Sequence, residues 1–318
     1  MKTRNTLWLF ALACILASGA FAETAPPAAI LLGCQGDVTI VKSGGEQVKA
    51  SFGMALDPGD EVRTGKDAKA EIHFDNGQWV QIGPNSSTQV HGSKAQAASN
   101  SGSMGEKSFE VVQNFLKLKD SEGTSSLARL RSGDKHSELR AESPMQTKIM
   151  ESVPTFKWTA SDPTQELLLT LYNDEGVLWK HEVKTGESSV IYPSDAPALS
   201  PDVTYSWVLE TTDPLVFPPL RSEAAFFEVL SPEQRTAIES SLDEIVADDK
   251  PSNIASHLVR ASLFYDNNLM EDAIAETKMA IELEPDNSDL HAILARLYSE
   301  TGRTEDAVKE YDRVLEGR

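Results

Sequence analysis

The C-terminal stretch 257–284, HLVRASLFYDNNLMEDAIAETKMAIELE, recurs as the stretch 291–318, HAILARLYSETGRTEDAVKEYDRVLEGR, when position 257 is placed on position 291. This displacement of 34 residues pairs His257 with His291, Ala261 with Ala295, Leu263 with Leu297, Glu271 with Glu305, Asp272 with Asp306, Ala273 with Ala307, Glu276 with Glu310 and Glu282 with Glu316. A fixed period of this length is typical of stacked helical units. The C-terminal part of the chain is therefore predicted to be an α-helical repeat.

The apolar residues of this stretch have the sizes that a packed pair of helices requires. Small side chains let the two helices of a unit approach each other, and larger ones fill the gap between them. The small residues are Ala261, Ala273 and Ala280, and the larger ones are Phe264, Ile274 and Ile281. We expect Pro285 to end the second helix and Asn287 to cap the next one.

The period and pattern of residues 254–318 resemble tetratricopeptide repeats. The helical region is expected at 231–318, as a half unit followed by repeats at 254–287 and 288–318. The half unit begins at Ser231-Pro232-Glu233-Gln234, which has the pattern of a helix N-terminus.

The resemblance also implies a binding site. In that family the first helix of each unit lines a concave groove for protein partners. The positions that correspond to this groove are Leu258, Ser262, Tyr265, Ile293 and Arg296. A clamp for peptide carboxylates would need Lys and Asn where this chain has Leu258 and Ser262, so that specificity is not expected. The alternative is a repeat that serves only as a packing spacer.

The preceding region, 151–230, is predicted to be a β-sandwich. Short strand-like runs separated by turn residues lie at 155–158, 166–172, 177–183, 189–192, 204–209 and 224–229. Trp158, Trp179 and Trp207 supply large apolar bodies for its core. The segments PTFKW and YPSDAPALSPDVTYSWVLE resemble immunoglobulin-like or fibronectin-like modules. A sugar-stacking role for the tryptophans is the less favoured alternative.

The stretch 69–82 is predicted to be a hairpin with one apolar face. Ala70, Ile72 and Phe74 alternate with polar residues, which is the period of a half-buried strand. A three-residue loop 75–77 with a left-handed Gly77 sets Ile72 opposite Val80 and Ala70 opposite Ile82. His73 is then expected on the solvent face.

The carboxylates nearby suggest a metal site, but turns explain them better. Calcium needs oxygen ligands at alternate positions of one loop, whereas Asp57 and Asp60 belong to one turn and Asp75 to another. Asx side chains bond nearby backbone amides in turns, and glycine supplies the positive φ. We therefore predict neither a metal nor a cofactor, and we interpret His73 as a surface residue.

Four motifs resemble FecR-type extracytoplasmic domains over roughly residues 33–92. They are GDV at 36–38, LDPGDEVRTG at 56–65, FDNG at 74–77 and IGPNSS at 82–87. The resemblance implies a small β-domain, which we place at 28–150 with a flexible loop at 92–107. A short helix that closes this domain is expected at 108–120. Family members that regulate sigma factors have a cytosolic segment and an internal transmembrane helix. We expect neither in this chain, so only the binding-module part of the resemblance is expected to carry over.

The N-terminus predicts export. Lys2 and Arg4 precede an apolar run at 7–15 and a small-residue site at 20–22, the pattern of a cleaved signal peptide at 1–22. A retained membrane anchor is the alternative. The formal net charge of −20 disfavours nucleic acid and anionic lipid as partners. Of the two cysteines, Cys34 remains after cleavage and is expected to be buried and inert.

The sequence contains no motif of a known catalytic site, such as G-x-S-x-G, H-E-x-x-H, a phosphate-binding glycine loop or C-x-x-C. We therefore predict a non-catalytic protein of the periplasm or another exported compartment. It would bind other envelope proteins or peptides through the repeat and would have no membrane span after signal cleavage. The alternative is an extracytoplasmic sensor that binds a small ligand or a cell-wall glycan and signals to a membrane partner.

Overall fold

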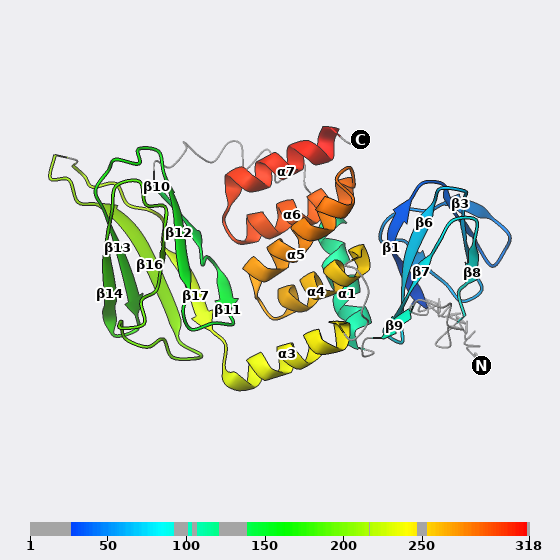
Figure 1. Ribbon diagram of the computed structural model, residues 1–318. Helices are drawn as coiled ribbons and strands as arrows, with labels where there is room; N and C mark the ends of the chain where they lie inside the picture. The colour runs from blue at the N-terminus through cyan, green and yellow to red at the C-terminus, as the bar shows by residue number, and fades with distance from the viewer. Residues whose placement is uncertain are drawn as a thin grey trace, which may run out of the picture.

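The computed structural model describes residues 27–91, 101–103, 107–120, 139–215, 217–246 and 253–316. A helical layer lies between two β-rich units, with the N-terminal unit on one side and the middle unit on the other (Figure 1). The predicted combination of β-rich units and C-terminal helices is confirmed. The predicted signal peptide at 1–22 and most of the loop predicted at 92–107 lie outside the described residues.

Two antiparallel sheets form the N-terminal β-unit. The first has the order β4 (Ala55–Leu56), β1 (Ala29–Gln35), β6 (Lys69–Phe74), β7 (Gln78–Ile82) and β9 (Ser101–Ser103). The second has the order β3 (Gln47–Lys49), β2 (Val38–Val41), β5 (Glu61–Thr64) and β8 (Ser87–Gln89). Leu31, Ile40 and Phe74 are among the buried side chains that form the core of this unit. Strand β9 lies within the stretch that we predicted to be a flexible loop, so that prediction was too broad.

Strand β1 is buried on both faces. Ala29 and Leu31 belong to the core of the β-unit, whereas Ile30 and Leu32 belong to the core of the helical layer. Successive side chains of a strand point to opposite faces of the sheet. The position of β1 between two cores therefore explains the uninterrupted apolar run AAILLGC at 28–34.

The hairpin of β6 and β7 has the predicted register. Ile72 pairs with Val80 and Ala70 pairs with Ile82, and Gly77 in the connecting loop has a φ of 80°. The backbone N–H of Gly77 donates to the carbonyl oxygen of Phe74 at 3.0 Å. The loop thus depends on a residue that adopts a positive φ without strain.

We expect Gly77→Ala to lower the free energy of unfolding of this unit by about 1–2 kcal/mol, because a β-carbon disfavours the left-handed conformation. Urea unfolding followed by circular dichroism would measure the loss. Gly83→Ala is the matched control, because no atom lies within 4 Å of the β-carbon that it adds. Equal stability of the two variants would contradict the prediction.

The prediction that His73 faces solvent is wrong. His73 and Glu71 are both buried, with His73 fully inaccessible. The alternation of β6 is as predicted, but helices α1 (Lys107–Leu116) and α4 (Ile254–Asp266) cover the face that carries these two residues. Strand β6, which its alternating sequence predicts to be half-buried, is therefore covered on both faces.

The turn before β5 is stabilised by a buried carboxylate. Asp60 accepts hydrogen bonds from Lys42 Nζ at 2.7 Å, Ser43 N at 3.1 Å and Asp57 N at 3.0 Å. Gly59 in the same turn has a φ of 95°. The predicted role of Asp60 as a turn residue is confirmed.

Asp60→Ala is expected to cost about 2 kcal/mol of unfolding free energy, because it leaves two backbone N–H groups and an ammonium group without their acceptor. Asp57→Ala is the control, since the Asp57 side chain is 61% exposed and lies 3.5 Å from Lys42. Thermal unfolding of both variants would separate the two positions. The prediction would be wrong if Asp57→Ala cost as much as Asp60→Ala.

Two sheets also form the middle β-unit. One has the order β10 (Leu139–Ser143), β12 (Thr155–Ala160) and β15 (Ser189–Ile191). The other has the order β11 (Thr147–Ile149), β17 (Ala225–Val229), β16 (Thr204–Thr211), β13 (Leu167–Asn173) and β14 (Gly176–Val183). Each strand-like run predicted from the sequence corresponds to one of these strands. Residues 139–149, which we assigned to the first domain, pair with β12 and β17, so the expected boundary at 150 is corrected toward the N-terminus.

The core of the middle unit contains two of the three tryptophans. Trp158 and Trp207 are buried, and Trp207 Nε1 donates to the carbonyl oxygen of Pro144 at 2.8 Å. Trp179 is half-buried and stacks on Phe156 with ring centroids 5.9 Å apart. The tryptophans thus serve packing, as predicted.

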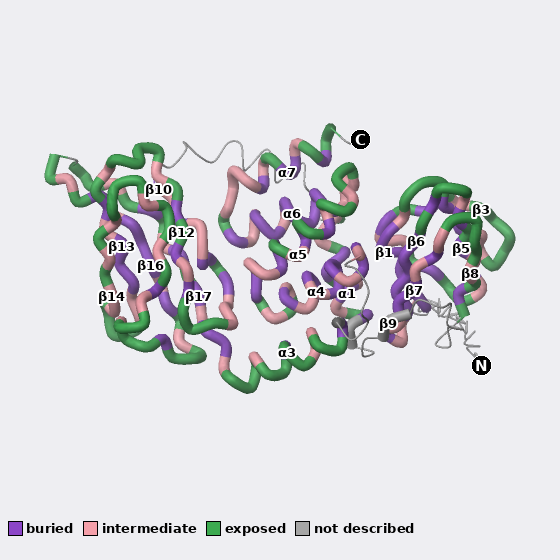
Figure 2. Tube along the Cα trace, in the orientation of Figure 1, coloured by how far each residue is buried: buried purple, intermediate pink, exposed green. Residues whose placement is uncertain are grey.

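The helical layer consists of α1, the short 3₁₀ helix η1 (Lys117–Asp120), α3 (Pro232–Val246), α4, α5 (Met270–Leu283), α6 (Ser288–Glu300) and α7 (Thr304–Glu316). Helix α4 packs on α5 and α6 packs on α7, and the buried residues concentrate on α4 and α6 (Figure 2). The Asn287 side chain caps α6 by accepting from Asp289 N and Leu290 N. Among the described residues, no helix has both the length and the apolar character that a bilayer crossing requires.

Candidate functional site: the face formed by α4 and α6

The five residues predicted to line a groove lie on the first helices of the two units. We call the surface formed by Leu258, Ser262, Tyr265, Ile293 and Arg296 the α4–α6 face. Leu258, Ser262 and Ile293 are buried, whereas Tyr265 and Arg296 are half-buried. The expectation of an open groove at these residues is therefore not met, because other parts of the chain cover the face.

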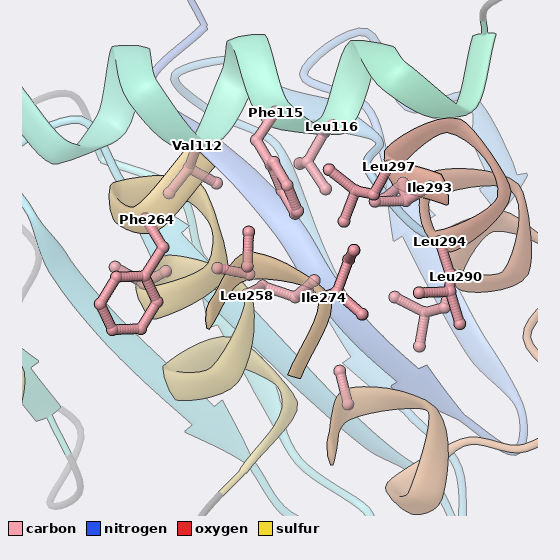
Figure 3. Packing of buried hydrophobic residues seen from close by; sticks show 14 of the residues in the cluster. Val112, Phe115, Leu116, Leu258, Phe264, Ile274, Leu290, Ile293, Leu294 and Leu297 are labelled. Carbon is pink, nitrogen blue, oxygen red and sulfur yellow. The ribbon is translucent and has the colours of Figure 1, made fainter. Parts of the chain in front are cut away.

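Helix α1 packs chiefly on α4 and the following η1 packs on α6, so the two segments together cover the α4–α6 face. Figure 3 shows Val112, Phe115 and Leu116 of α1 directed at side chains of α4 and α6. The Phe115 ring lies 5.7 Å from the Tyr265 ring, centroid to centroid. A helix from the first half of the chain thus occupies the place at which a partner was expected.

The sequence of α1 has one apolar face. Phe109, Val112, Phe115 and Leu116 are buried, whereas Glu110 and Asn114 are exposed. This spacing of three and four residues is that of an amphipathic helix. The predicted helix exists, but it packs between the β-unit and the repeat and does not close the β-unit alone.

A lysine joins the end of this segment to both neighbours. Lys119 Nζ donates to the carbonyl oxygen of Phe52 at 2.6 Å and lies 3.4 Å from Asp289 Oδ2 in the first turn of α6. The same ammonium group lies 5.5 Å from the centre of the Phe52 ring. Lys119 is therefore the polar anchor of η1 on the repeat.

The half-buried residues of the face belong to a polar cluster at its edge. Arg296 Nε donates to Glu300 Oε1 at 2.8 Å. Burial and the neighbouring Glu300 carboxylate raise the pKa of Tyr265. Tyr265 of α4 and the Arg296–Glu300 pair of α6 thus form a rim beside α1 that a partner could contact.

The β-unit also contacts the N-terminus of α4 through Glu71. Glu71 Oε2 accepts from the backbone N–H of Ala255 at 3.0 Å, and Glu71 Oε1 accepts from Gln81 Nε2 at 3.2 Å. A helix N-terminus favours a carboxylate at this position. Burial nevertheless raises the pKa of Glu71 above its usual range.

A cavity of about 180 Å³ lies at this junction, and its lining includes Cys34, Lys69, Glu71, Gln81, Asn253 and Glu284. Burial raises the pKa values of Glu284 and of the Cys34 thiol, which also lies near Glu284. The raised pKa lowers the thiolate fraction, which agrees with an inert cysteine. Cys34 is half-buried, so the expectation of full burial is corrected.

His73 lies at the contact between the sheet and α1 without a polar partner. Both of its ring nitrogens are buried and make no hydrogen bond among the described residues. Its neighbours across the sheet are Ile30 and Trp79, and its ring stacks on Phe109 with centroids 5.6 Å apart. This burial lowers the pKa of His73 to about 4.

The histidines and glutamates that recur in the repeat form matching pairs. His257 Nδ1 lies 2.6 Å from Glu276 Oε2, and His291 Nδ1 lies 2.6 Å from Glu310 Oε2. Each pair joins the first helix of its unit to the second. These residues recur because they join the two helices of each unit. The 34-residue period of the sequence had already paired the two histidines and the two glutamates.

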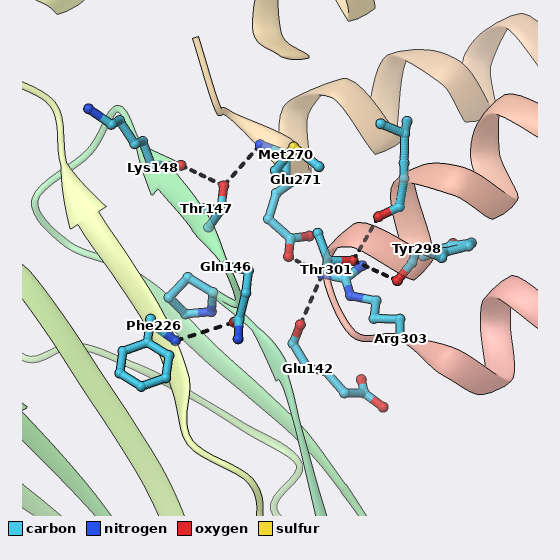
Figure 4. A network of polar contacts seen from close by, with 12 residues as sticks. Glu142, Gln146, Thr147, Lys148, Phe226, Met270, Glu271, Tyr298, Thr301 and Arg303 are labelled. Atoms are coloured by element: carbon cyan, nitrogen blue, oxygen red, sulfur yellow. Dashed lines mark hydrogen bonds and ion pairs between the residues drawn. The ribbon is translucent and has the colours of Figure 1, made fainter. Parts of the chain in front are cut away.

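The opposite side of the helical layer contacts the middle unit through polar groups (Figure 4). Met270 N donates to Thr147 Oγ1 at 2.9 Å, and Lys148 N donates to the carbonyl oxygen of Asn268 at 2.8 Å. Arg303 donates to the carbonyl oxygen of Glu142 at 2.9 Å and pairs with Glu271. The repeat is thereby connected to both β-units.

The residues considered for a metal site do not come together. Asp57 and Asp60 lie in the turn before β5, in the second sheet, whereas His73 lies on the face of β6 that α1 covers. Within the described residues, no three side chains of His, Cys, Asp or Glu are grouped to hold a metal ion.

Comparison with known families agrees with the helical geometry. Residues 264–317 match the tetratricopeptide repeat family. The match runs from the end of α4 through α5, α6 and α7. None of the curated proteins compared with the chain matches it. Tetratricopeptide repeats generally mediate contacts between proteins, which is consistent with an interaction or scaffold role for this chain.

Proposed function

We propose that the protein is a non-catalytic, exported interaction protein that binds helical segments of envelope proteins through its tetratricopeptide repeat. The N-terminal unit is assigned as a FecR-like domain and the middle unit as an immunoglobulin- or fibronectin-like sandwich. The hydrogen bond of 2.7 Å from Ser200 N to the Tyr205 hydroxyl, at the start of β16, supports the second assignment, because a tyrosine corner of this kind occurs in immunoglobulin-like folds.

One observation carries the proposal. An amphipathic helix distant in sequence, α1, lies on the α4–α6 face with its apolar side against Leu258 and Ile293. A face that accepts a helix from its own chain has the shape and apolar character to accept one from another protein. The rim residues Tyr265 and Arg296 are half-buried and stay in reach of a partner.

Charge reversal at the rim tests the proposal. Arg296→Glu would place a second carboxylate beside Glu300, 2.8 Å from the present Arg296 Nε. In a pull-down from envelope extract, we expect this variant to lose most of the partners that the wild-type chain recovers. Arg313→Glu is the matched control, because Arg313 pairs with Glu310 on α7, away from the face. Equal recovery of partners by both variants would show that the α4–α6 face is not the binding site.

The second candidate is a sensor, and the cavity at Glu71 and Glu284 favours it. A small polar ligand or a cell-wall glycan fragment bound there would touch the β-unit and the repeat at once, so binding would alter their contact. Calorimetry with glycan fragments on the wild-type chain and on Lys69→Ala would test this. If the fragments gave no heat at millimolar concentration, while the wild-type chain still captured proteins that Arg296→Glu does not, the sensor hypothesis would be rejected and the interaction hypothesis kept.

A further inference from the structure

We propose that α1 is a resident occupant of the α4–α6 face that a partner must displace, and that this partner is an amphipathic helix with a hydrogen-bond acceptor at the place of Phe109. This inference rests on the proposed function and names the regulation and the partner chemistry of the same face. It follows from the apolar contact of α1, from the Lys119 anchor in the adjoining η1 and from the buried, unpartnered imidazole of His73.

The apolar contact defines the spacing that a partner must reproduce. Phe109, Val112, Phe115 and Leu116 supply the buried side chains of α1. A competing helix therefore needs apolar residues at positions i, i+3, i+6 and i+7. Because Glu110 and Asn114 of α1 are exposed, as is Lys117 at the start of η1, the outer side of such a helix is free to vary.

His73 indicates that α1 is an imperfect occupant. A buried imidazole without partners costs free energy that a hydrogen bond would recover. The group that faces this ring from α1 is Phe109, which offers no acceptor. A carboxylate at this place would accept a hydrogen bond from one ring N–H of His73, and this bond would be charge-assisted when the ring is protonated.

Lys119 provides the means to loosen α1 without changing the face. Its partners on the rest of the chain are the Phe52 carbonyl and Asp289, and both remain when Lys119 is replaced. The fraction of molecules with an open face sets the apparent affinity for an added helix. Lys119→Ala is therefore expected to strengthen the binding of an added peptide that carries its own lysine.

The experiment measures binding of a labelled peptide with the sequence of residues 107–120, KSFEVVQNFLKLKD, to the full chain by fluorescence anisotropy. We expect weak binding to the wild type and binding on the order of tenfold tighter to Lys119→Ala. Lys117→Ala is the matched control, because Lys117 donates to Asn114 within the same segment and is exposed. It should bind like the wild type. Val112→Ala offers a second way to loosen α1.

Equal affinity for the wild type and both loosened variants, or no binding to any of them while their helical circular dichroism is unchanged, would overturn the inference. That outcome would leave the proposed function standing if Arg296→Glu still lost its partners. The acceptor is tested with peptides in which Phe109 is replaced by Glu or by Lys. The Glu peptide should bind Lys119→Ala about tenfold tighter than the Lys peptide, and a further His73→Leu exchange should remove the difference. A difference that persists without His73 would refute the role of the acceptor.

Discussion

Phe115→Ala is expected to lower the free energy of unfolding by about 3–5 kcal/mol, because it removes a fully buried ring from the core between α1 and the repeat. The ring contacts Tyr265 and shares a core with Leu258 and Ile293, so its loss leaves a cavity that three elements border. Urea unfolding followed by circular dichroism at 222 nm, a general helix signal, would measure the shift of the helical transition.

The matched control for this prediction is Phe217→Ala. The Phe217 side chain is 93% exposed, so the same chemical change there should alter the stability by less than about 0.5 kcal/mol. A loss at Phe115 as small as that at Phe217 would show that α1 does not contribute to the core. It would also undermine the assignment of α1 as the occupant of the α4–α6 face.

Acidification is expected to weaken the fold through His73. The pKa of His73 is lowered from 6.5 to about 4 by burial, so the unfolded chain binds a proton more readily than the folded one. Above about pH 6.5 the histidine does not lower the free energy of unfolding, because it is neutral in both states. As the pH falls from 6.5 toward 4, the unfolded chain is protonated first and the free energy of unfolding decreases. At pH 4.5 the loss should reach about 2.5 kcal/mol, since each unit of pKa difference corresponds to about 1.4 kcal/mol.

The His73 contribution is obtained as a difference between proteins. Burial raises the pKa values of Glu71 and Glu284, and these groups act in the opposite direction, because their folded forms bind protons more readily than the unfolded chain does. The pH dependence of the wild type therefore combines opposing effects. Subtracting the urea-unfolding profile of His73→Leu from that of the wild type isolates the histidine.

We expect the difference in unfolding free energy to fall by about 2.5 kcal/mol between pH 7 and pH 4.5. The two proteins differ only at position 73, so the contributions of the other titrating groups cancel in the subtraction. His91→Leu, an exchange of an exposed histidine, is the control and should keep the acid-induced loss of the wild type. If His73→Leu lost as much stability on acidification as the wild type, the buried imidazole would not be the cause.

Local sequence patterns predicted those features that depend on neighbouring residues. The 34-residue period predicted the paired helices, and the Asn287 cap followed from the residue type at a helix start. The register of Ile72 with Val80 followed from alternation and from the loop that Gly77 permits. The cap and the register depend on residues only a few positions apart, whereas the paired helices were predicted from a pattern that recurs after 34 residues.

Tertiary structure alone decided what the α4–α6 face contacts. Leu258 and Ile293 were predicted to line a groove, and the structure covers them with α1, a segment remote in sequence. The face of β6 read as polar because it carries Glu71 and His73, yet both are buried. Periodicity shows that a face exists and which residues share it, whereas shape and apolar area across distant segments decide what packs on that face.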